Sequence, residues 1–397
     1  MKKYLFLLPL AALALAACSS EELVETGAKA SDNNALQIRT AMGNVTRGTV
    51  WNDGNFTEFH LSTSGGGFVA AEDETGVAAG TPAQIDEDVT KRSGSWVIGG
   101  LNAGESYWWP SKKTQATFEA YAPTSAAPND PYTASNANDL ADLQDIVVAF
   151  NSGVASDFLT GVPLYFRHIT SQIVVKADNN ATDKVKIEVK AIRLNNINSQ
   201  SQYSMPTSST VESMPSGYTP WSTPNMPINY VANLASPMTL TRASADITGS
   251  NPILLIPQQL TTMQTTNTGG TYTATGQYIS VLVKITTVAE PTTLVYPKNN
   301  IVSEENDGSE KYAWAAVDVN TNWEPGKKYI YTLHFTEGGY GKIDPNTDGG
   351  NDNPGDDNDP DTDDDPKPGD DIEDSPVKLT LDVKVVDWEE VTEAQNM

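Results

Sequence analysis

Short apolar segments with a two-residue period recur along almost the whole chain, and clusters of Gly, Pro, Asn and Asp separate them. A β-strand that faces a core on one side and solvent on the other produces this period. Within residues 184–194, for example, Val185, Ile187 and Val189 alternate with lysine and glutamate. The 24 Pro and 29 Gly also disfavour long helices. The sequence therefore predicts an all-β protein built from sandwiches rather than a β-α array.

The chain is long enough for two or three domains, at 397 residues. Residues 199–250 are dense in Ser, Thr, Pro, Met and Asn, which predicts a long segment with few regular elements and a domain boundary near residue 200. Strand-length segments resume at residue 253. We therefore expect two β-sandwiches in tandem, at residues 35–200 and 201–342.

The composition excludes several classes of function. With 25 Lys and Arg against 51 Asp and Glu, the net charge is −26, and so acidic a surface repels nucleic acid and anionic lipid. One Cys and three His are too few for a zinc or iron-sulfur centre, and a single Cys cannot form a disulfide within the chain. We expect no cofactor and no nucleic-acid partner.

The N-terminus has the features of an export signal, which we assign to residues 1–17. Two lysines precede an apolar run of 13 residues, Leu5 to Ala17, which is too short to span a bilayer as a stable helix. The run ends in Leu-Ala-Ala-Cys18, which resembles the lipobox of bacterial lipoproteins, so Cys18 is the predicted lipidation site and membrane anchor. Residues 18–34 are polar and read as a flexible tether. Its short acidic run after Cys18 resembles a signal for the cell surface.

Residues 343–376 differ from the rest of the chain. They hold 14 Asp and Glu but one Lys, and almost no apolar side chain, so we predict a disordered acidic linker. Asp344, Asn346 and Asp348 copy the first half of a calcium loop, but the position that needs a bidentate Glu is Gly355. They are a weak calcium candidate, and a solvated linker is the favoured interpretation.

The last segment, residues 377–397, contains the clearest two-residue period in the chain. Its apolar side chains alternate with Lys, Thr and Asp, and they are Val377, Leu379, Leu381, Val383 and Val385. The first strand-like segment, at residues 36–42, carries Leu36, Ile38, Thr40 and Met42 on one face. Both segments are predicted β-strands.

Two further groups of residues are candidates for ligand binding or catalysis. The aromatic run Tyr107-Trp108-Trp109 suits either a platform for sugar stacking or a plug at the end of a sandwich, and the plug is favoured. His60, His168 and His334 lie far apart in sequence without a recognisable triad partner. No nucleophile elbow or phosphate-binding loop occurs. The sequence thus gives no positive indication of an enzyme.

A series of segments, in order, resembles the fimbrillin family, the two-domain lipoprotein pilins of type V pili. The segments are TRG at 46–48, YWWP at 107–110, FEAYAP at 118–123, DIVVA at 145–149, VPLYFRH at 162–168, LIPQ at 255–258, WEPGKKYIY at 323–331 and DW at 387–388. The resemblance implies two transthyretin-like Greek-key β-sandwiches, export as a lipoprotein to the outer membrane, and polymerisation with other pilin subunits after a protease cuts behind an N-terminal Arg.

On this resemblance, cleavage after Arg47 would remove the strand that carries Leu36, Ile38 and Met42 together with the lipid on Cys18. A sandwich without its first strand has a groove and an unpaired edge that another strand must fill. The apolar face from Val377 to Val385 is the predicted donor strand. The same strand could instead fold back into its own domain, and the long acidic linker leaves open a shaft, tip, anchor or accessory position.

A second function remains open, that of a surface lipoprotein that keeps its lipid and binds glycan or protein through a sandwich face. The adhesion ligand, of host or bacterial origin, is not specified by the sequence. Binding through Trp108 and Trp109 would favour this alternative.

Overall fold

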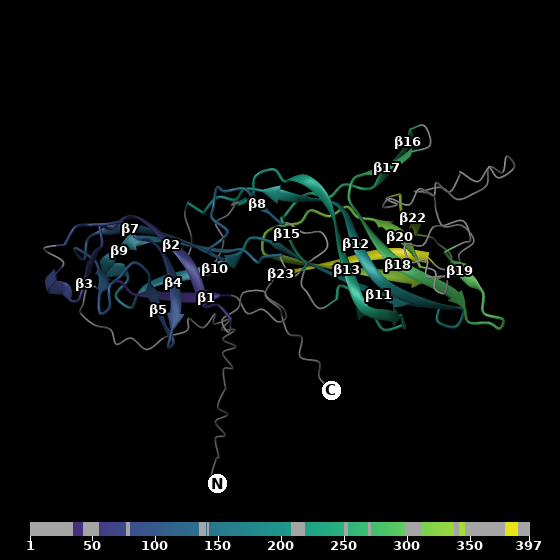
Figure 1. Cartoon of the computed structure of the whole chain (residues 1–397), viewed down its shortest axis with the longest axis horizontal. Helices are drawn as coiled ribbons and strands as arrows, with labels where there is room; N and C mark the ends of the chain where they lie inside the picture. The colour runs from purple at the N-terminus through teal and green to yellow at the C-terminus, as the bar shows by residue number, and fades with distance from the viewer. Residues whose placement is uncertain are drawn as a thin grey trace, which may run out of the picture.

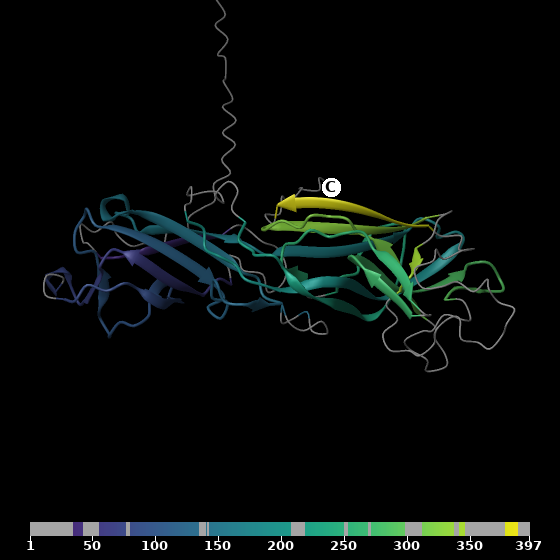
Figure 2. The ribbon, with the colours of Figure 1, turned by 90° about the horizontal axis from the view of Figure 1, so that it is seen from above.

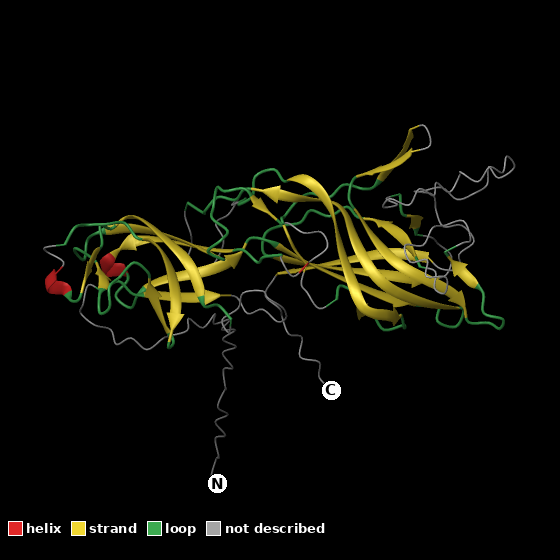
Figure 3. Cartoon of the chain, viewed as in Figure 1, coloured by secondary structure: helices red, strands yellow, loops and turns green. Residues whose placement is uncertain are grey.

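The computed structural model describes residues 35–42, 55–76, 80–134, 140, 143–207, 219–249, 253–268, 271–297, 312–336, 341–345 and 378–387. These residues fold almost entirely into strands, so the predicted all-β class is confirmed (Figures 1 and 3). The helical elements in this part of the chain are short 3-10 turns, including η1 (Glu74–Gly76) and η3 (Ala155–Asp157). None of the described residues forms a helix long and apolar enough to span a bilayer.

The N-terminal unit is a seven-stranded sheet in the order β1-β10-β9-β7-β2-β4-β5, with a small sheet of β3 and β6 beside it. The bounds are β1 Ile38–Met42, β2 Glu58–Gly65, β3 Val69–Ala71, β4 Asp86–Arg92, β5 Ser95–Ile98, β6 Ser106–Trp108, β7 Gln115–Ala122, β9 Val147–Val154 and β10 Val162–His168. All pairs in the large sheet are antiparallel except β1 with β10, which is parallel.

The C-terminal unit is a sandwich of two sheets. One has the order β14-β11-β21-β23 with β15 on β11, and the other has β13-β12-β18-β20-β22 with β19 on β18 and β8 on β12. A separate hairpin of β16 and β17 projects from it (Figure 1). The bounds are β8 Tyr132–Thr133, β11 Ser171–Asn179, β12 Val185–Ser201, β13 Asn225–Thr239, β14 Ala245–Asp246, β15 Ile253–Leu255, β16 Gln264–Thr268, β17 Thr271–Thr275, β18 Tyr278–Thr287, β19 Leu294–Tyr296, β20 Ala313–Asp318, β21 Lys327–Thr336, β22 Lys342–Ile343 and β23 Lys378–Asp387.

The chain first contributes β8 to the C-terminal sandwich, returns to the N-terminal sheet with β9 and β10, and crosses for the last time at Ile169 and Thr170, so the boundary does not lie near residue 200. β11 pairs along its length with β21, and β12 pairs with β18, so residues 171–201 belong to the C-terminal sandwich. The short strand β8 also pairs with β12. The partners in the β11–β21 and β12–β18 pairs lie more than 80 residues apart and those in the β8–β12 pair more than 65, and local composition does not report such distant partners.

Residues 199–250 contain more regular structure than their composition predicts. β13 runs for 15 residues through this segment and pairs antiparallel with β12, with two register shifts. Its Pro227 and Pro237 are exposed on a strand at the sheet edge, where a missing N–H costs little. The predicted segment with few regular elements therefore contains an edge strand, which tolerates proline.

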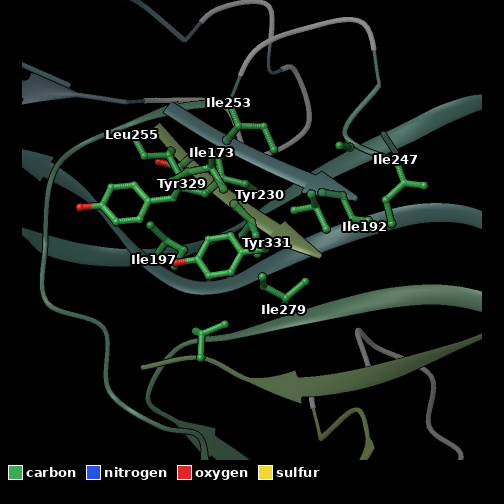
Figure 4. Close-up of a cluster of buried hydrophobic side chains, with 14 of the residues drawn as sticks. Ile173, Ile192, Ile197, Tyr230, Ile247, Ile253, Leu255, Ile279, Tyr329 and Tyr331 are labelled. Atoms are coloured by element: carbon green, nitrogen blue, oxygen red, sulfur yellow. The ribbon is translucent and has the colours of Figure 1, made fainter. Parts of the chain in front are cut away.

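The main hydrophobic core lies between the two sheets of the C-terminal sandwich. Figure 4 shows Ile173, Tyr329 and Tyr331 from one sheet facing Ile192 and Ile279 from the other, all of them buried. Side chains from residues 121–148 join the same core next to the junction between the units. The N-terminal unit has its own core, in which Phe56, Phe59 and Phe166 pack against one another.

The junction is held by main-chain and side-chain hydrogen bonds. His168 Nδ1 lies 2.9 Å from Asp145 Oδ1, and both side chains are buried. The Gly326 amide donates to the Thr170 carbonyl at 3.0 Å. Gly326 has φ +66°, and a Cβ there would lie 3.0 Å from the His168 carbonyl oxygen, so only glycine permits this close approach.

On the N-terminal sheet, His60 of β2 lies between two carboxylates of β4. Its Nδ1 is 2.9 Å from Asp88 Oδ1 and its Nε2 is 3.0 Å from Asp86 Oδ1. Burial lowers the pKa of His60, but the hydrogen bonds and charges of Asp86 and Asp88 outweigh it, and the net pKa is raised above 6.5.

We predict that His60 stabilises the N-terminal unit in a pH-dependent way. Because its pKa is higher in the folded than in the unfolded state, its contribution is fully present below pH 6.5 and is lost as the pH rises through the folded pKa. The two carboxylates are largely exposed, so the contribution is below about 1 kcal/mol. Thermal melts of wild type and His60→Gln from pH 5 to 9 check this. A stability difference that grew with rising pH would contradict it.

Candidate functional site

The two strands nearest the ends of the described chain both lie at sheet edges. β1 is the outermost strand of the seven-stranded sheet and hydrogen-bonds to β10 alone within it, with Ile38 opposite Val162 and Met42 opposite Phe166. β23 is the outermost strand of its sheet and pairs along all ten residues with β21 (Figure 2). These two edge strands are the candidate functional site.

β1 is well packed on its core face. Leu36, Ile38 and Thr40 are buried, while Gln37 and Arg39 between them are half-buried, so the predicted alternation is present. Burying the two aliphatic side chains contributes about 3–6 kcal/mol as an upper bound. The Trp96 indole N–H also donates to Thr40 Oγ1 at 3.0 Å, which fixes the strand against β5.

Main-chain hydrogen bonds hold the residues before β1 against Tyr107 and against the start of β10. The Leu36 amide donates to the Tyr107 carbonyl at 2.7 Å, and the Val162 amide donates to the Gln37 carbonyl at 2.8 Å. Gly161 precedes β10 with φ +101°, and a Cβ there would lie 3.2 Å from the Gln37 carbonyl oxygen. The glycine therefore lets β1 approach the start of β10.

β23 is packed much less completely than β1. Leu381, Val383 and Val385 lie opposite Leu333, Tyr331 and Tyr329, so they share the core-facing side of the sheet. Leu381 packs partly against the core, but Val383 is 41% exposed and Val385 49% exposed. All ten residues of β23 pair with β21, whereas two of its apolar side chains, Val383 and Val385, stay about half exposed.

One side-chain contact adds to the pairing of β23. His334 of β21 lies with Nδ1 2.8 Å from Asp178 Oδ2 of β11 and with Nε2 3.4 Å from Asp382 Oδ2 of β23. The Asp382 side chain is 84% exposed, so water screens this ion pair and its stabilisation is small. The attachment of β23 therefore depends mainly on main-chain hydrogen bonds.

A buried ion pair holds the chain where the acidic segment begins. Arg193 of β12 donates through Nη2 to Asp344 Oδ2 at 2.9 Å, and the Tyr278 hydroxyl donates to Asp344 Oδ1 at 3.1 Å. The guanidinium lies 4.5 Å from the ring centroid of Trp314, and both charged side chains are almost fully buried. The Asp344 side chain is therefore a fixed point of the sandwich, directly after β22.

This arrangement corrects two sequence expectations. The residue proposed as the first calcium ligand, Asp344, uses both carboxylate oxygens within the protein, and Asn346 and Asp348 lie outside the described residues. No cluster of three metal-binding side chains occurs in the part of the chain that the structure describes. Residues 343–345 also belong to the ordered sandwich, where Ile343 pairs with Ala315, so the predicted linker of 343–376 starts too early.

Several predicted site residues lie outside the described residues. These are Cys18, Arg47 and Val377. For Leu379 the structure gives the backbone position, opposite Phe335, and for Met42 the position opposite Phe166. The lipidation site and the cleavage site therefore remain predictions.

The aromatic run at 107–109 lies inside the N-terminal unit. Trp109 is 3% exposed and packs edge to face against Phe68 and Phe118, and Trp108 donates its indole N–H to the Ala71 carbonyl at 3.0 Å. Neither ring offers an open face for a sugar. The structure thus removes the observation that had favoured binding through Trp108 and Trp109.

Each of the three histidines contacts an aspartate, but none of these contacts forms a catalytic constellation in the described residues. In the buried group at the junction, Thr170 Oγ1 donates to Asp145 Oδ1 at 3.4 Å, so this hydroxyl contacts the carboxylate, whereas a nucleophile in a triad contacts the imidazole. His60 and His334 contact aspartates on neighbouring strands, and His168 contacts Asp145 just before β9.

The Arg193 and Asp344 pair is not predicted by the sequence. The available signal was a single arginine between Ile192 and Leu194 in an apolar strand segment, since a buried charge needs a partner. The partner, Asp344, is 151 residues away and is one of 14 acidic residues in its segment, so the pair could not have been assigned without the fold.

A family model described as fimbrillin-like matches residues 62–348. A search of curated protein sequences finds no match to the chain. Among solved structures, a fimbrial protein from Bacteroides vulgatus is 13% identical, with 83% of this chain and 92% of that chain covered and a TM-score of 0.43. Proteins provisionally assigned to cell adhesion also match, from Bacteroides ovatus (15% identity, 77% and 93% coverage, TM-score 0.41) and Bacteroides uniformis (13%, 90% and 100%, 0.41).

We predict that Arg193→Ala destabilises the C-terminal unit by about 3–5 kcal/mol, because it leaves the Asp344 carboxylate buried without its cation. The melting temperature should fall by on the order of 10 °C. Differential scanning calorimetry measures it. The control is Arg242→Ala, whose partner Asp183 is exposed, with an expected cost below about 1 kcal/mol. Equal costs for the two variants would refute the anchor.

Proposed function

This chain belongs to the fimbrillin-like family, and from that premise we propose that it is a structural subunit of a type V surface pilus that assembles by exchange of edge strands. A pilin-like, structural role in adhesion follows from the family itself. The steps of assembly proposed below are supported by the two edge strands.

The first step is export and anchoring. The apolar run before Cys18 suits a lipoprotein signal, and several acyl chains on that cysteine would hold the subunit to the outer membrane. The segment between Cys18 and Ala35 is polar. It would let the folded units stand away from the membrane at the cell surface.

The second step is processing after Arg47. Strand β1 ends at Met42 and the next described residue is Asn55, so Arg47 falls in the connection that follows β1. A cut there would separate β1 covalently from the rest of the chain. Its departure would open the β10 edge and the pocket of Leu36 and Ile38.

The third step is donation of β23. Val383 and Val385 are about half exposed in their own sandwich, so their transfer to a closed groove would bury further apolar surface, worth about 1 kcal/mol for each side chain. The donor has ten residues, whereas β1 pairs five residues with a β10 of seven. A longer strand could pair with the whole β10 edge. The fixed point at Asp344 would leave residues 345–397 as the transferable arm.

The observation that carries the proposal is the contrast between the two edges. β1 is short and deeply packed, and β23 is long and half open on its apolar face. In this structure β23 lies on its own sheet, which we interpret as the state before transfer. The alternative, in which β23 only completes its own sandwich, predicts that processing does not lead to polymers.

We predict that protein recovered from cells starts at Gly48, and that Arg47→Gln retains the lipidated N-terminus. The matched control is Arg39→Gln. Arg39 lies within β1 opposite Pro163, and a protease cuts poorly within a strand that is paired to its neighbour. Mass spectrometry of the N-terminal peptide measures the result. Processing that stopped in Arg39→Gln but continued in Arg47→Gln would place the cut elsewhere.

We also predict that the chain starting at Gly48 forms polymers that Val383→Asp with Val385→Asp abolishes. Both side chains are partly exposed, so the double variant should keep the monomer folded, whereas a carboxylate in the acceptor groove costs several kcal/mol. Lys384→Asp changes the opposite face of the same strand and is the control. Size-exclusion chromatography and electron microscopy detect the polymers. If the wild-type chain stays monomeric with partner subunits supplied, or the double variant polymerises normally, donation by β23 is wrong.

A further inference from the structure

A cavity of about 680 Å³ lies at the end of the C-terminal sandwich that adjoins the junction between the units. Three segments form it: the chain before β13, the turn after β15 and the turn between β20 and β21. Its size is in the range of small-ligand sites. None of its lining residues belongs to β1 or β23, so it is a separate site from the two edge strands used in the assembly steps proposed above.

One wall of the cavity is an indole held in a fixed orientation. Trp221 donates its ring N–H to the Ile169 carbonyl, and its ring lies 5.7 Å from that of Tyr132 and 5.5 Å from that of Tyr203. The Trp221 side chain remains half-buried at the cavity. A ring that is supported on one side and open on the other needs no reordering to stack on a ligand.

Another wall of the cavity is the turn at residues 322–325, which Tyr329 holds in place. The Tyr329 hydroxyl donates to the Asn322 carbonyl at 2.8 Å and accepts from the Glu324 amide at 2.7 Å. Gln258 holds the adjacent wall, since its side chain accepts from the Asn198 amide and donates to the Asn198 carbonyl, each at 3.0 Å. The main chain around the cavity is thus preorganised.

Three polar side chains line the cavity without hydrogen-bonding to the described residues around it. Thr223, Asn322 and Glu324 are exposed and line the cavity, and their side chains make no hydrogen bond to any other described residue. They offer a hydroxyl, an amide and a carboxylate to a ligand. Because the main chain of Asn322 and Glu324 is fixed by Tyr329, their side chains reach the cavity from defined positions.

The charge of the lining selects the class of ligand. Among the described lining residues Glu324 is the one charged group, and none is Lys, Arg or His. An anionic ligand would meet a carboxylate without a compensating cation. A planar indole together with amide, hydroxyl and carboxylate groups matches the apolar faces and hydroxyl edges of a sugar.

We propose that this cavity binds a neutral oligosaccharide, which stacks on Trp221 and hydrogen-bonds to Asn322 and Glu324. No residue of β1 or β23 lines this cavity, although Val385 of β23 lies opposite Tyr329, whose hydroxyl holds the turn of Asn322 and Glu324.

The test uses the full chain in detergent with lactose, N-acetyllactosamine, mannotriose and cellotriose as neutral probes and 3′-sialyllactose as the anionic probe. Tryptophan fluorescence and saturation-transfer NMR measure binding. At least one neutral probe should bind with a Kd of about 1 mM or below, and 3′-sialyllactose should bind at least about tenfold more weakly, a difference of about 1.4 kcal/mol. Failure of all neutral probes at about 10 mM, or equal binding of the sialylated probe, would overturn the proposal.

The variants keep the test independent of folding. Trp221→Ala should abolish binding, but it also removes packing on Tyr132 and Tyr203, so the decisive variant is Asn322→Ala at an exposed position. It should weaken the neutral probe at least about tenfold. Asn320→Ala, which changes an exposed asparagine of the same turn outside the cavity lining, is the matched control. Equal affinity for the two asparagine variants would assign the binding to another surface.

Discussion

Main-chain hydrogen bonding at the sheet edges is the constraint on which this structure depends. A strand at an edge presents a row of N–H and C=O groups that must find partners in protein or in water. In the N-terminal sheet β1 covers the β10 edge, and in the C-terminal sandwich β23 covers the β21 edge. The two covering strands come from opposite ends of the chain. Each can leave its edge without any change in the order of the remaining strands.

Under the proposal, the Arg193 and Asp344 pair would separate the part of the chain that stays from the part that is transferred. Removing two charges from water is expensive, and the pair repays that cost through its hydrogen bonds, the Tyr278 hydroxyl and the Trp314 ring. The 33 residues between Asp344 and Lys378 could extend to roughly 110 Å. The anchor therefore confines any excursion of the last strand to the chain beyond it and leaves β22 paired with β20.

The sequence predicts local features of this molecule better than long-range ones. Alternation identified the class of fold and both terminal strands, because Leu36, Ile38 and Thr40 report burial through a local period. The boundary between units and the Arg193 anchor depend on partners far away in the chain, such as β11 with β21. Alternation also predicted which face of β23 is apolar, but not that Val383 and Val385 stay half exposed, because their exposure depends on how far the opposite sheet extends.

Under the proposed assembly, the unequal packing of the two edge strands would give an order to their exchange. Leu36, just before β1, and Ile38 within it are buried, and Thr40 accepts a hydrogen bond from Trp96. Thermal motion alone would rarely release this segment, so the proposed covalent cut would make its loss permanent. β23 has less apolar burial to lose and needs no cut, because its connection to Asp344 is long. A donor packed as tightly as β1 would remain on its own sheet, and an acceptor covered as loosely as β23 would open before reaching the cell surface. Under the proposal, this asymmetry would keep subunits closed until processing and allow strand exchange only afterwards.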